Sequence, residues 1–283
     1  MPSLNNSRDL RQHTFVYFGT PTVASDTLAT LIERGFTPAL VVTSPDALRG
    51  RGLALTPSET KTLALTHRIL VLTPQTLDAA AIAAIAAYHA DYALCVAYGK
   101  IFPEELIAAF PQGVLNVHYS LLPKYRGATP LETALLAGEH ETGVTVQKMV
   151  KELDAGDIIA QAATPIAPDE TARELRPRLI ELGAKLLADT LPRYLAGEIV
   201  PVAQDAARAS RARKLSKEDG LLALDAPALE NWNKYRAYAD TIGTYFFDNG
   251  KRMKITSAEF AKGEFRVLRV VPEGKSEQPY ICR

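Results

Sequence analysis

The segment LNVHYSLLPKYRG runs from Leu115 to Gly127 and changes from an apolar strand pattern into a loop that carries polar side chains. Residues 114–117 suit a buried strand, whereas Pro123 and Gly127 are typical of a loop. Asn116 and His118 are two positions apart, so a strand directs both side chains to the same side. An amide and an imidazole at the carboxyl end of a strand can stabilise an oxyanion. We therefore interpret this segment as a candidate catalytic strand end.

Strand and helix patterns alternate on both sides of this segment. Strand patterns cover residues 14–18, 39–43, 69–72, 91–97, 142–149 and 158–166, and helix patterns cover residues 23–34, 76–87, 130–137 and 170–195, with a short helix from Glu59. This alternation predicts an α/β fold with a Rossmann-like, mostly parallel sheet that helices cover on both faces. Gly19, Tyr98, His118 and the 151–157 loop fall at strand ends, where such sheets bind ligands. The absence of a G-x-G-x-x-G pattern argues against a dinucleotide cofactor.

The pattern changes after residue 196. Residues 197–214 resemble a linker with a basic tail, and residues 245–255 form two short strand patterns around the turn Asn249-Gly250. With a further strand at 265–271, these features predict a small, shortened β-barrel of the OB-like type, which can bind nucleic acid. We therefore divide the chain into four parts: a disordered extension (1–13), a large α/β domain (14–196), a linker (197–214) and a small β domain (215–283).

Composition describes an ordinary globular protein, with 47% hydrophobic and 23% charged residues and a formal net charge of zero. The charge is unevenly spread. From Arg208 onward the chain holds 15 Lys and Arg against 10 Asp and Glu, a charge of +5, and the preceding part holds 17 against 22, a charge of −5. The C-terminal part is thus the one suited to an anionic partner. Two cysteines, no signal-peptide pattern and no long apolar run predict a cytoplasmic protein without a membrane span, which we expect to be a monomer.

Three motifs carry a resemblance to a known family. The pattern N-V-H-x-S-L-L-P-x-Y-R-G begins at Asn116, L-D-x-G-D begins at Leu153, and V-A-Y-G-x-I-x-P begins at Val96. Together they resemble the folate-dependent formyltransferases, and among these the enzymes that formylate methionyl-tRNA. The chain departs from the family pattern at Tyr119, where a small residue or proline is usual. It departs again at residues 53–54, where Leu-Ala replaces a basic pair, and its C-terminal domain is short.

The resemblance implies a catalytic set of Asn116, His118 and Asp154, in which the amide and imidazole stabilise the oxyanion and the carboxylate supports the imidazole. It also implies 10-formyltetrahydrofolate as the formyl donor, in a slot formed by two chain segments. The residues expected to line this slot are Tyr98, Gly99, Ile101, Ser120, Leu121, Leu122 and Pro123. We expect no metal, because the remaining histidines have no ligand spacing.

The acceptor implied by the resemblance is the amino group of initiator methionyl-tRNA, formylated for translation initiation. The predicted tRNA contacts come from the long polar loop 44–58 and from the basic end of the linker: Arg49, Arg51, Arg211, Arg213 and Lys214. Arg51 is the strongest single candidate, since a guanidinium can pair with a phosphate or a base edge. Two alternatives stay open. One is a formyltransferase for a small amine such as an amino-sugar nucleotide, and the other is a catalytically silent tRNA- or folate-binding protein.

Overall fold

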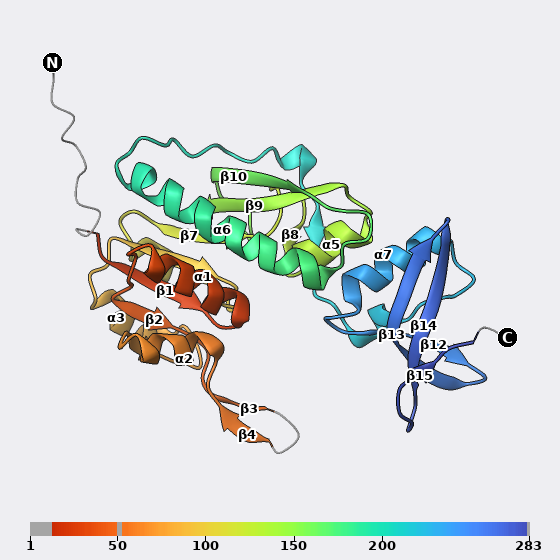
Figure 1. The fold of residues 1–283 in the computed structure, drawn as a ribbon. Coiled ribbons are helices and arrows are strands. Elements are labelled where there is room, and N and C mark those ends of the chain that lie inside the picture. The colour runs from red at the N-terminus through yellow and green to blue at the C-terminus, as the bar shows by residue number, and fades with distance from the viewer. Residues whose placement is uncertain (1–12, 50–52, 282–283) are drawn as a thin grey trace. The chain divides into compact units, whose positions relative to one another are not determined.

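The computed structural model describes residues 13–49 and 53–281. Its largest element is a seven-stranded sheet with the order β10-β9-β7-β6-β1-β2-β5 (Figure 1). The strands are β1 (Phe15–Gly19), β2 (Leu40–Val42), β5 (Leu70–Leu72), β6 (Tyr92–Val96), β7 (Val114–His118), β9 (Glu141–Lys148) and β10 (Ile158–Pro165). The pairs that join β5, β2, β1, β6 and β7 are parallel, and β9 is antiparallel to β7. The predicted Rossmann-like α/β class is confirmed.

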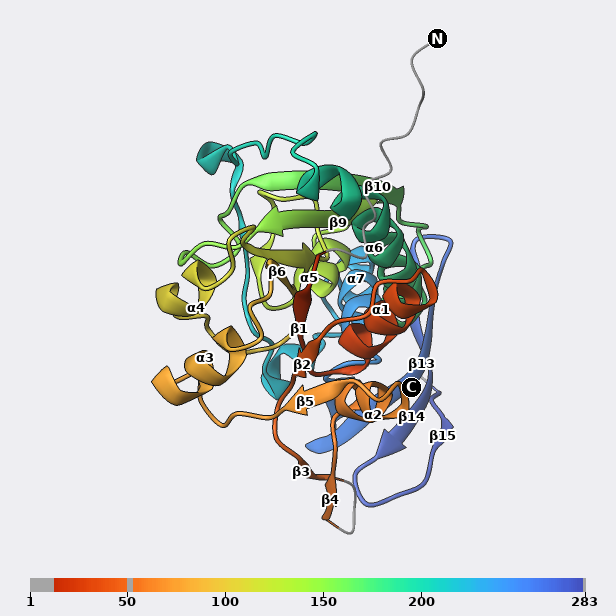
Figure 2. The same cartoon turned by 90° about the vertical axis from the view of Figure 1, so that its left-hand side faces the viewer.

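Burial explains why the central strands are apolar throughout. Every residue of β1 and of β6 is buried, which requires cover on both faces of the sheet. The covering helices are α1 (Thr22–Glu33), α2 (Glu59–Thr66), α3 (Ala79–Ala86), α4 (Glu104–Ala108) and α6 (Ala172–Leu195). Helices α3 and α4 lie on one side of the sheet and α1 and α6 on the other (Figure 2). Helices α2 and α3 begin at side-chain caps, since the side chains of Ser58 and Asp78 accept hydrogen bonds from the backbone N–H groups of Lys61 and Ala81.

The chain forms two compact units, and each is assembled from several segments. The first unit comprises the described residues up to His118 together with Val144–Ala162 and Ile180–Asp205. The second unit comprises Tyr119–Gly143, Ala163–Leu179 and the described residues from Ala206 onward. The loop that follows the N-x-H strand therefore belongs to the same unit as the C-terminal strands.

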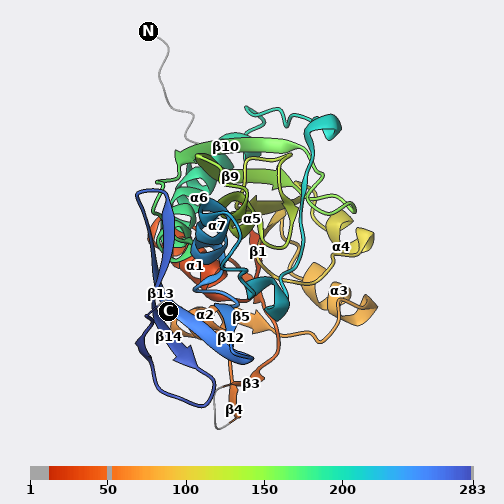
Figure 3. The ribbon, with the colours of Figure 1, turned by 90° about the vertical axis from the view of Figure 1, so that its right-hand side faces the viewer.

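The second unit contains a four-stranded antiparallel sheet with the order β12-β13-β14-β15. Helix α7 packs against this sheet (Figure 3). The strands are β12 (Thr244–Asp248), β13 (Lys251–Ala261), β14 (Glu264–Pro272) and β15 (Gln278–Pro279), and the helices are α5 (Pro130–Leu136) and α7 (Ala228–Tyr238). Its core is formed by Leu222, Trp232, Tyr235, Phe246, Met253, Ile255 and Val270. The small antiparallel domain expected from the Asn-Gly turn is thus present.

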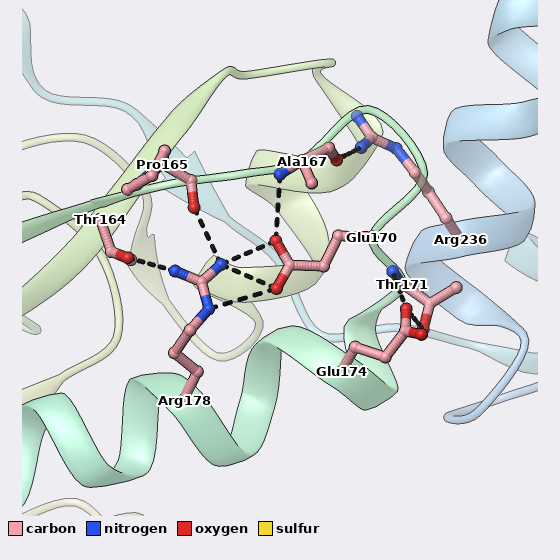
Figure 4. A network of polar contacts seen from close by, with 8 residues as sticks. All are labelled: Thr164, Pro165, Ala167, Glu170, Thr171, Glu174, Arg178 and Arg236. Carbon is pink, nitrogen blue, oxygen red and sulfur yellow. Dashed lines mark hydrogen bonds and ion pairs between the residues drawn. The ribbon is translucent and has the colours of Figure 1, made fainter.

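A polar network fixes the connection between β10 and α6 within this unit (Figure 4). The Arg178 guanidinium donates to both Glu170 carboxylate oxygens at 2.7 Å, to the Pro165 carbonyl at 2.8 Å and to the Thr164 hydroxyl. Glu170 also accepts from the backbone N–H of Ala167. The Ala167 carbonyl in turn accepts from the buried Arg236 of α7. Helix α7 is therefore held by the connection that precedes α6 as well as by its own sheet.

Three local features differ from the sequence expectation. Residues 44–58, expected as a loop, contain a hairpin of β3 (Ala47–Arg49) and β4 (Ala54–Thr56). The expected linker contains a short 3₁₀ helix, Ala206–Arg208, and the strand β11 (Arg211–Ala212), which pairs with β8 (Arg126–Gly127). Helix α7 was not predicted. The expected extension 1–13, apart from His13, lies outside the described residues.

Candidate active site

The site is built on β7, between β6 and β9. Asn116 lies opposite Cys95 of β6 and Gln147 of β9, and His118 lies opposite Thr145 of β9. Residues in register on neighbouring strands share a face of the sheet, so the Asn116 amide stands beside the Gln147 amide. His118 is buried, with 5% of its surface exposed, while Asn116 is half-buried. The strand thus presents both predicted groups at its carboxyl end.

Asp154 reaches this strand end from the loop between β9 and β10. Its Oδ2 atom lies 3.6 Å from His118 Nδ1, and both side chains are nearly covered. Asp154 adopts a left-handed backbone conformation, with φ of 52°, which aspartate tolerates better than most residues. Two residues later, a Cβ atom added to Gly156 would lie only 1.6 Å from the Lys148 carbonyl oxygen. Glycine is required there because the loop backbone passes directly against the end of β9. This close approach places Asp154 beside His118.

Two glutamines hold the Asp154 loop. Gln147 is almost fully buried and donates from Nε2 to Asp154 Oδ1 at 3.0 Å. Gln204 donates from its own Nε2 to the backbone carbonyls of Asp154, at 2.9 Å, and of Gly156, at 2.7 Å. The two Asp154 oxygens therefore have different neighbours, since Oδ1 faces Gln147 and Oδ2 faces His118. Sequence reasoning missed both glutamines, because alternation along β9 shows which residues share a face with Gln147 but not that this face meets Asn116.

Cys95 and Tyr98 lie at the end of the adjacent strand β6. Burial raises the pKa of the Cys95 thiol to about 12, and the negative charge of Asp154 adds to the increase. Burial likewise raises the pKa of Tyr98 to about 12. The Tyr98 hydroxyl is buried and has no hydrogen-bond partner among the residues that the structure describes, and its ring packs edge-on against Phe18 and Phe102. Tyr98 therefore keeps its proton, and its hydroxyl is a donor that no group within residues 13–49 and 53–281 accepts from.

The other residues predicted to line the folate slot are divided between the two units. In the first unit, Gly99 has a φ of 83° and the Ile101 side chain is 88% exposed. In the second unit, Ser120 is fully buried and donates from Oγ to the Lys124 carbonyl at 2.6 Å. Leu121 is half-buried, Leu122 is buried, and the Leu122–Pro123 bond is cis.

The cations predicted to contact RNA have different surroundings. Arg211 and Lys214 are exposed, whereas the Arg213 guanidinium donates to both carboxylate oxygens of Asp219. Arg49 is the last residue of β3, and Arg51 lies outside the described residues. Arg213 is thus engaged within the second unit, where Asp219 also forms the capping box of the 3₁₀ helix Lys217–Gly220.

Within residues 13–49 and 53–281, no cluster of three or more His, Cys, Asp or Glu side chains could hold a metal ion. Over the same part of the chain, no helix has both the length and the hydrophobicity that a membrane crossing needs.

The site gathers an amide, an imidazole and a carboxylate at the carboxyl edge of a Rossmann-like sheet. This arrangement is typical of acyl-transfer enzymes of α/β fold. Residues 12–191 match the family model described as formyl transferase, and residues 214–271 match the model of the formyl transferase C-terminal domain. The chain belongs to the formyl transferase family.

The relatives extend over nearly the whole chain. A methionyl-tRNA formyltransferase of Citrifermentans bemidjiense is 41% identical over 270 residues, which cover 94% of this chain and 84% of that protein. Among solved structures, the methionyl-tRNA formyltransferase of Clostridium thermocellum has a TM-score of 0.63 at 15% identity and covers 92% and 98% of the two chains. The sugar 3N-formyl transferase WlaRD, solved in the presence of dTDP and 5-N-formyl-THF, has a TM-score of 0.67 at 20% identity and covers 88% and 87%. These two structures support the fold.

Proposed function

We propose that this protein transfers the formyl group of 10-formyltetrahydrofolate to the amino group of initiator methionyl-tRNA, in the cytoplasm, for translation initiation. The observation that carries the proposal is the Asp154–His118 contact of 3.6 Å beside Asn116, in a chain that is 41% identical to a methionyl-tRNA formyltransferase. For function we retain the division into a catalytic segment (14–196), a linker (197–214) and a C-terminal segment (215–283).

The three groups account for the steps of formyl transfer. The amine attacks the formyl carbon, and the carbonyl oxygen becomes an oxyanion that the Asn116 amide and the His118 imidazole stabilise by hydrogen bonding. The tetrahedral intermediate then breaks its bond to the folate nitrogen, and the proton that the attacking amine loses passes, directly or through water, to that nitrogen. Asp154 orients the imidazole, since its Oδ2 lies 3.6 Å from Nδ1.

Folate binding is supported by the unused donor at the end of β6. The Tyr98 hydroxyl is buried without a partner in the described part of the chain, and a buried donor left unpaired costs about 1–3 kcal/mol. A ligand that is rich in heteroatoms, such as a pterin ring, can supply the missing acceptor. Gly99, Ile101, Ser120, Leu121, Leu122 and Pro123 belong to the proposed donor site on the resemblance of their motifs.

A tRNA acceptor is supported by cations and aromatic rings on the exposed face of the C-terminal sheet. Phe247 is 58% exposed and lies opposite Arg252, and its neighbour on the same face, Tyr245, lies opposite Lys254. The Arg252 guanidinium lies 4.0 Å from the centre of the Tyr245 ring. Exposed rings beside cations suit RNA, because bases stack on rings and phosphates attract cations. We propose that Arg49, Arg51, Arg211, Arg213 and Lys214 also contact the tRNA.

Purified protein should formylate charged initiator tRNA when 10-formyltetrahydrofolate is supplied, and should not formylate an amino-sugar nucleotide at a comparable rate. Asn116→Ala, His118→Ala and Asp154→Ala should each lower kcat about 100-fold or more, because each variant lacks a group that acts on the transition state. Asp157→Ala is the matched control on the same loop and should lose much less activity. Faster transfer to the amino-sugar nucleotide than to tRNA would replace the tRNA proposal. Full activity of the Asn116, His118 or Asp154 variant would remove that residue from the mechanism.

A further inference from the structure

The Asp154 loop has a backbone that needs outside support. Asp154 lies in the left-handed region, a conformation that costs most non-glycine residues about 1–2 kcal/mol and aspartate less, and contacts in the fold must offset this cost. Its carboxylate must also face His118 with one particular oxygen. Both requirements call for a group that fixes the loop backbone as well as the side chain.

Gln204 provides the backbone support. Its Nε2 group has two hydrogens, and its two short hydrogen bonds go to the carbonyls of Asp154 and Gly156, on either side of Ala155. Backbone carbonyls only accept hydrogen bonds, so the chemistry of the partners identifies the NH₂ end of the amide as the group that faces them. The Gln204 amide thus links the backbone carbonyls of Asp154 and Gly156 and fixes the backbone of the loop between them.

The two glutamines form a connected pair. Gln204 Nε2 also lies 3.4 Å from Gln147 Oε1, and Gln147 in turn donates to Asp154 Oδ1. Because Gln147 occupies Oδ1, the other oxygen is the one that faces His118 Nδ1. Gln204 holds the loop backbone and Gln147 orients the carboxylate.

We propose that Gln204 is a positioning residue for formyl transfer, which acts by holding the Asp154 loop in the conformation that directs Oδ2 at His118. Gln204 belongs to the segment after α6 that looked like a plain linker in the sequence, so this segment has a role in catalysis as well as in connection. The inference rests on the proposed function.

The test uses the full-length protein with Gln204→Glu and Gln204→Met, in an assay of formyl transfer to charged initiator tRNA. A carboxylate at position 204 would face two carbonyl oxygens and repel them, and methionine keeps the length of the side chain without any donor. Both variants should lower kcat about tenfold or more, because a small displacement of a catalytic group is costly, while KM for either substrate changes less than about threefold.

The pH profile separates positioning from a general loss of structure. The facing carbonyl oxygens disfavour a carboxylate at position 204 and so raise the pKa of the introduced glutamate above its ordinary value of about 4.3. Protonated glutamic acid regains one O–H donor, so the kcat of Gln204→Glu relative to the parent should rise as pH falls from about 8 to about 6. The same ratio for Gln204→Met should stay flat. Gln112→Glu makes the same change at another half-buried glutamine of the first unit and should behave like the parent.

The outcomes are distinguishable. If the parent protein formylates no methionyl-tRNA, the proposed function is refuted. The kcat values of the parent and the two Gln204 variants are then compared with the acceptor that the protein does formylate. Parent activity with unchanged kcat in both Gln204 variants overturns the positioning role. A loss confined to KM also overturns it, since Gln204 would then act in substrate binding. If Gln204→Glu fails to fold, as judged by its melting temperature, the Gln204→Met kcat decides.

Discussion

Single residues explain why the active-site loop and the adjacent strand have the sequence that they do. Gly156 is required because any side chain would collide with the Lys148 carbonyl, and the same tight turn brings the Asp154 carboxylate to His118. Cys95 fills a fully buried position opposite Asn116, where its thiol stays protonated. The departure at Leu53 lies in the hairpin, where the side chain is 65% exposed.

The raised pKa of Cys95 predicts a stability change with pH. The native thiol keeps its proton up to about pH 12, whereas the unfolded thiol ionises near pH 8.5, at about the ordinary pKa of cysteine. Between these values the native state binds more protons than the unfolded state, so stability falls as pH rises. The melting temperature of Cys95→Ala should therefore fall less between about pH 8 and about pH 10 than that of the parent. Equal slopes for the two proteins would show that the Cys95 thiol does not contribute to this dependence.

At the scale of elements, β12 and β13 show how one hairpin serves two purposes. Phe246, Met253 and Ile255 face the core beneath α7, and the alternate residues face outward. The outward face combines Tyr245 and Phe247 with Arg252 and Lys254, which is an unusual use of aromatic residues if the sheet only stabilises the unit. This pattern is typical of a surface that binds RNA.

Lys254→Ala should weaken tRNA binding and reduce the slope of log Kd against log salt concentration by about one, because each phosphate contact releases about one counterion. Phe247→Ala should weaken binding with little effect on that slope, since stacking does not depend on charge. Fluorescence titration with labelled tRNA at several salt concentrations measures both. Lys275→Ala, an exposed lysine in the turn after β14, is the matched control. Binding by Lys254→Ala that equals the control would remove this face from the tRNA-binding surface.

On the scale of the whole molecule, the C-terminal segment is part of a unit that begins with the loop after His118. Arg236 of α7 donates to the Leu135 carbonyl of α5 and to the Ala167 carbonyl, and the Trp232 indole donates to the Pro168 carbonyl. Strand β11 pairs with β8, where a Cβ atom on Gly127 would lie 2.2 Å from the Ala212 carbonyl oxygen. The C-terminal segment therefore cannot be removed without loss of structure elsewhere in the unit.

A chain ending at Ser210 should keep protected amides in β1 and β6, because their cover comes from the first unit. Amides of residues 126–137 and 163–171 should exchange about tenfold faster or more, since they lose β11 and α7. Hydrogen exchange followed by mass spectrometry measures both regions in one sample. Unchanged protection of α5 in the shortened chain would contradict the assignment of these segments to one unit. Point variants such as Lys254→Ala are consequently the better test of RNA binding.

Local sequence patterns were sufficient for much of this protein. Alternating strand and helix patterns predicted the α/β sheet, N-x-H placed two polar side chains on one strand end, and Asn249-Gly250 predicted the β12–β13 hairpin. These features depend on residues that are close together in the chain, so their physical causes can be read from the sequence alone.

Tertiary structure decided the rest. Gln147 meets Asn116 only through the register of β7 and β9, and Gln204 reaches the Asp154 carbonyl across 50 positions of the chain. Helix α7 owes its stability to packing on α5 and the C-terminal sheet rather than to a strong local signal. Such contacts depend on how distant segments pack, and no local pattern specifies them. The sequence by itself thus indicated the candidate reacting groups, while the fold determined which residues hold them in place.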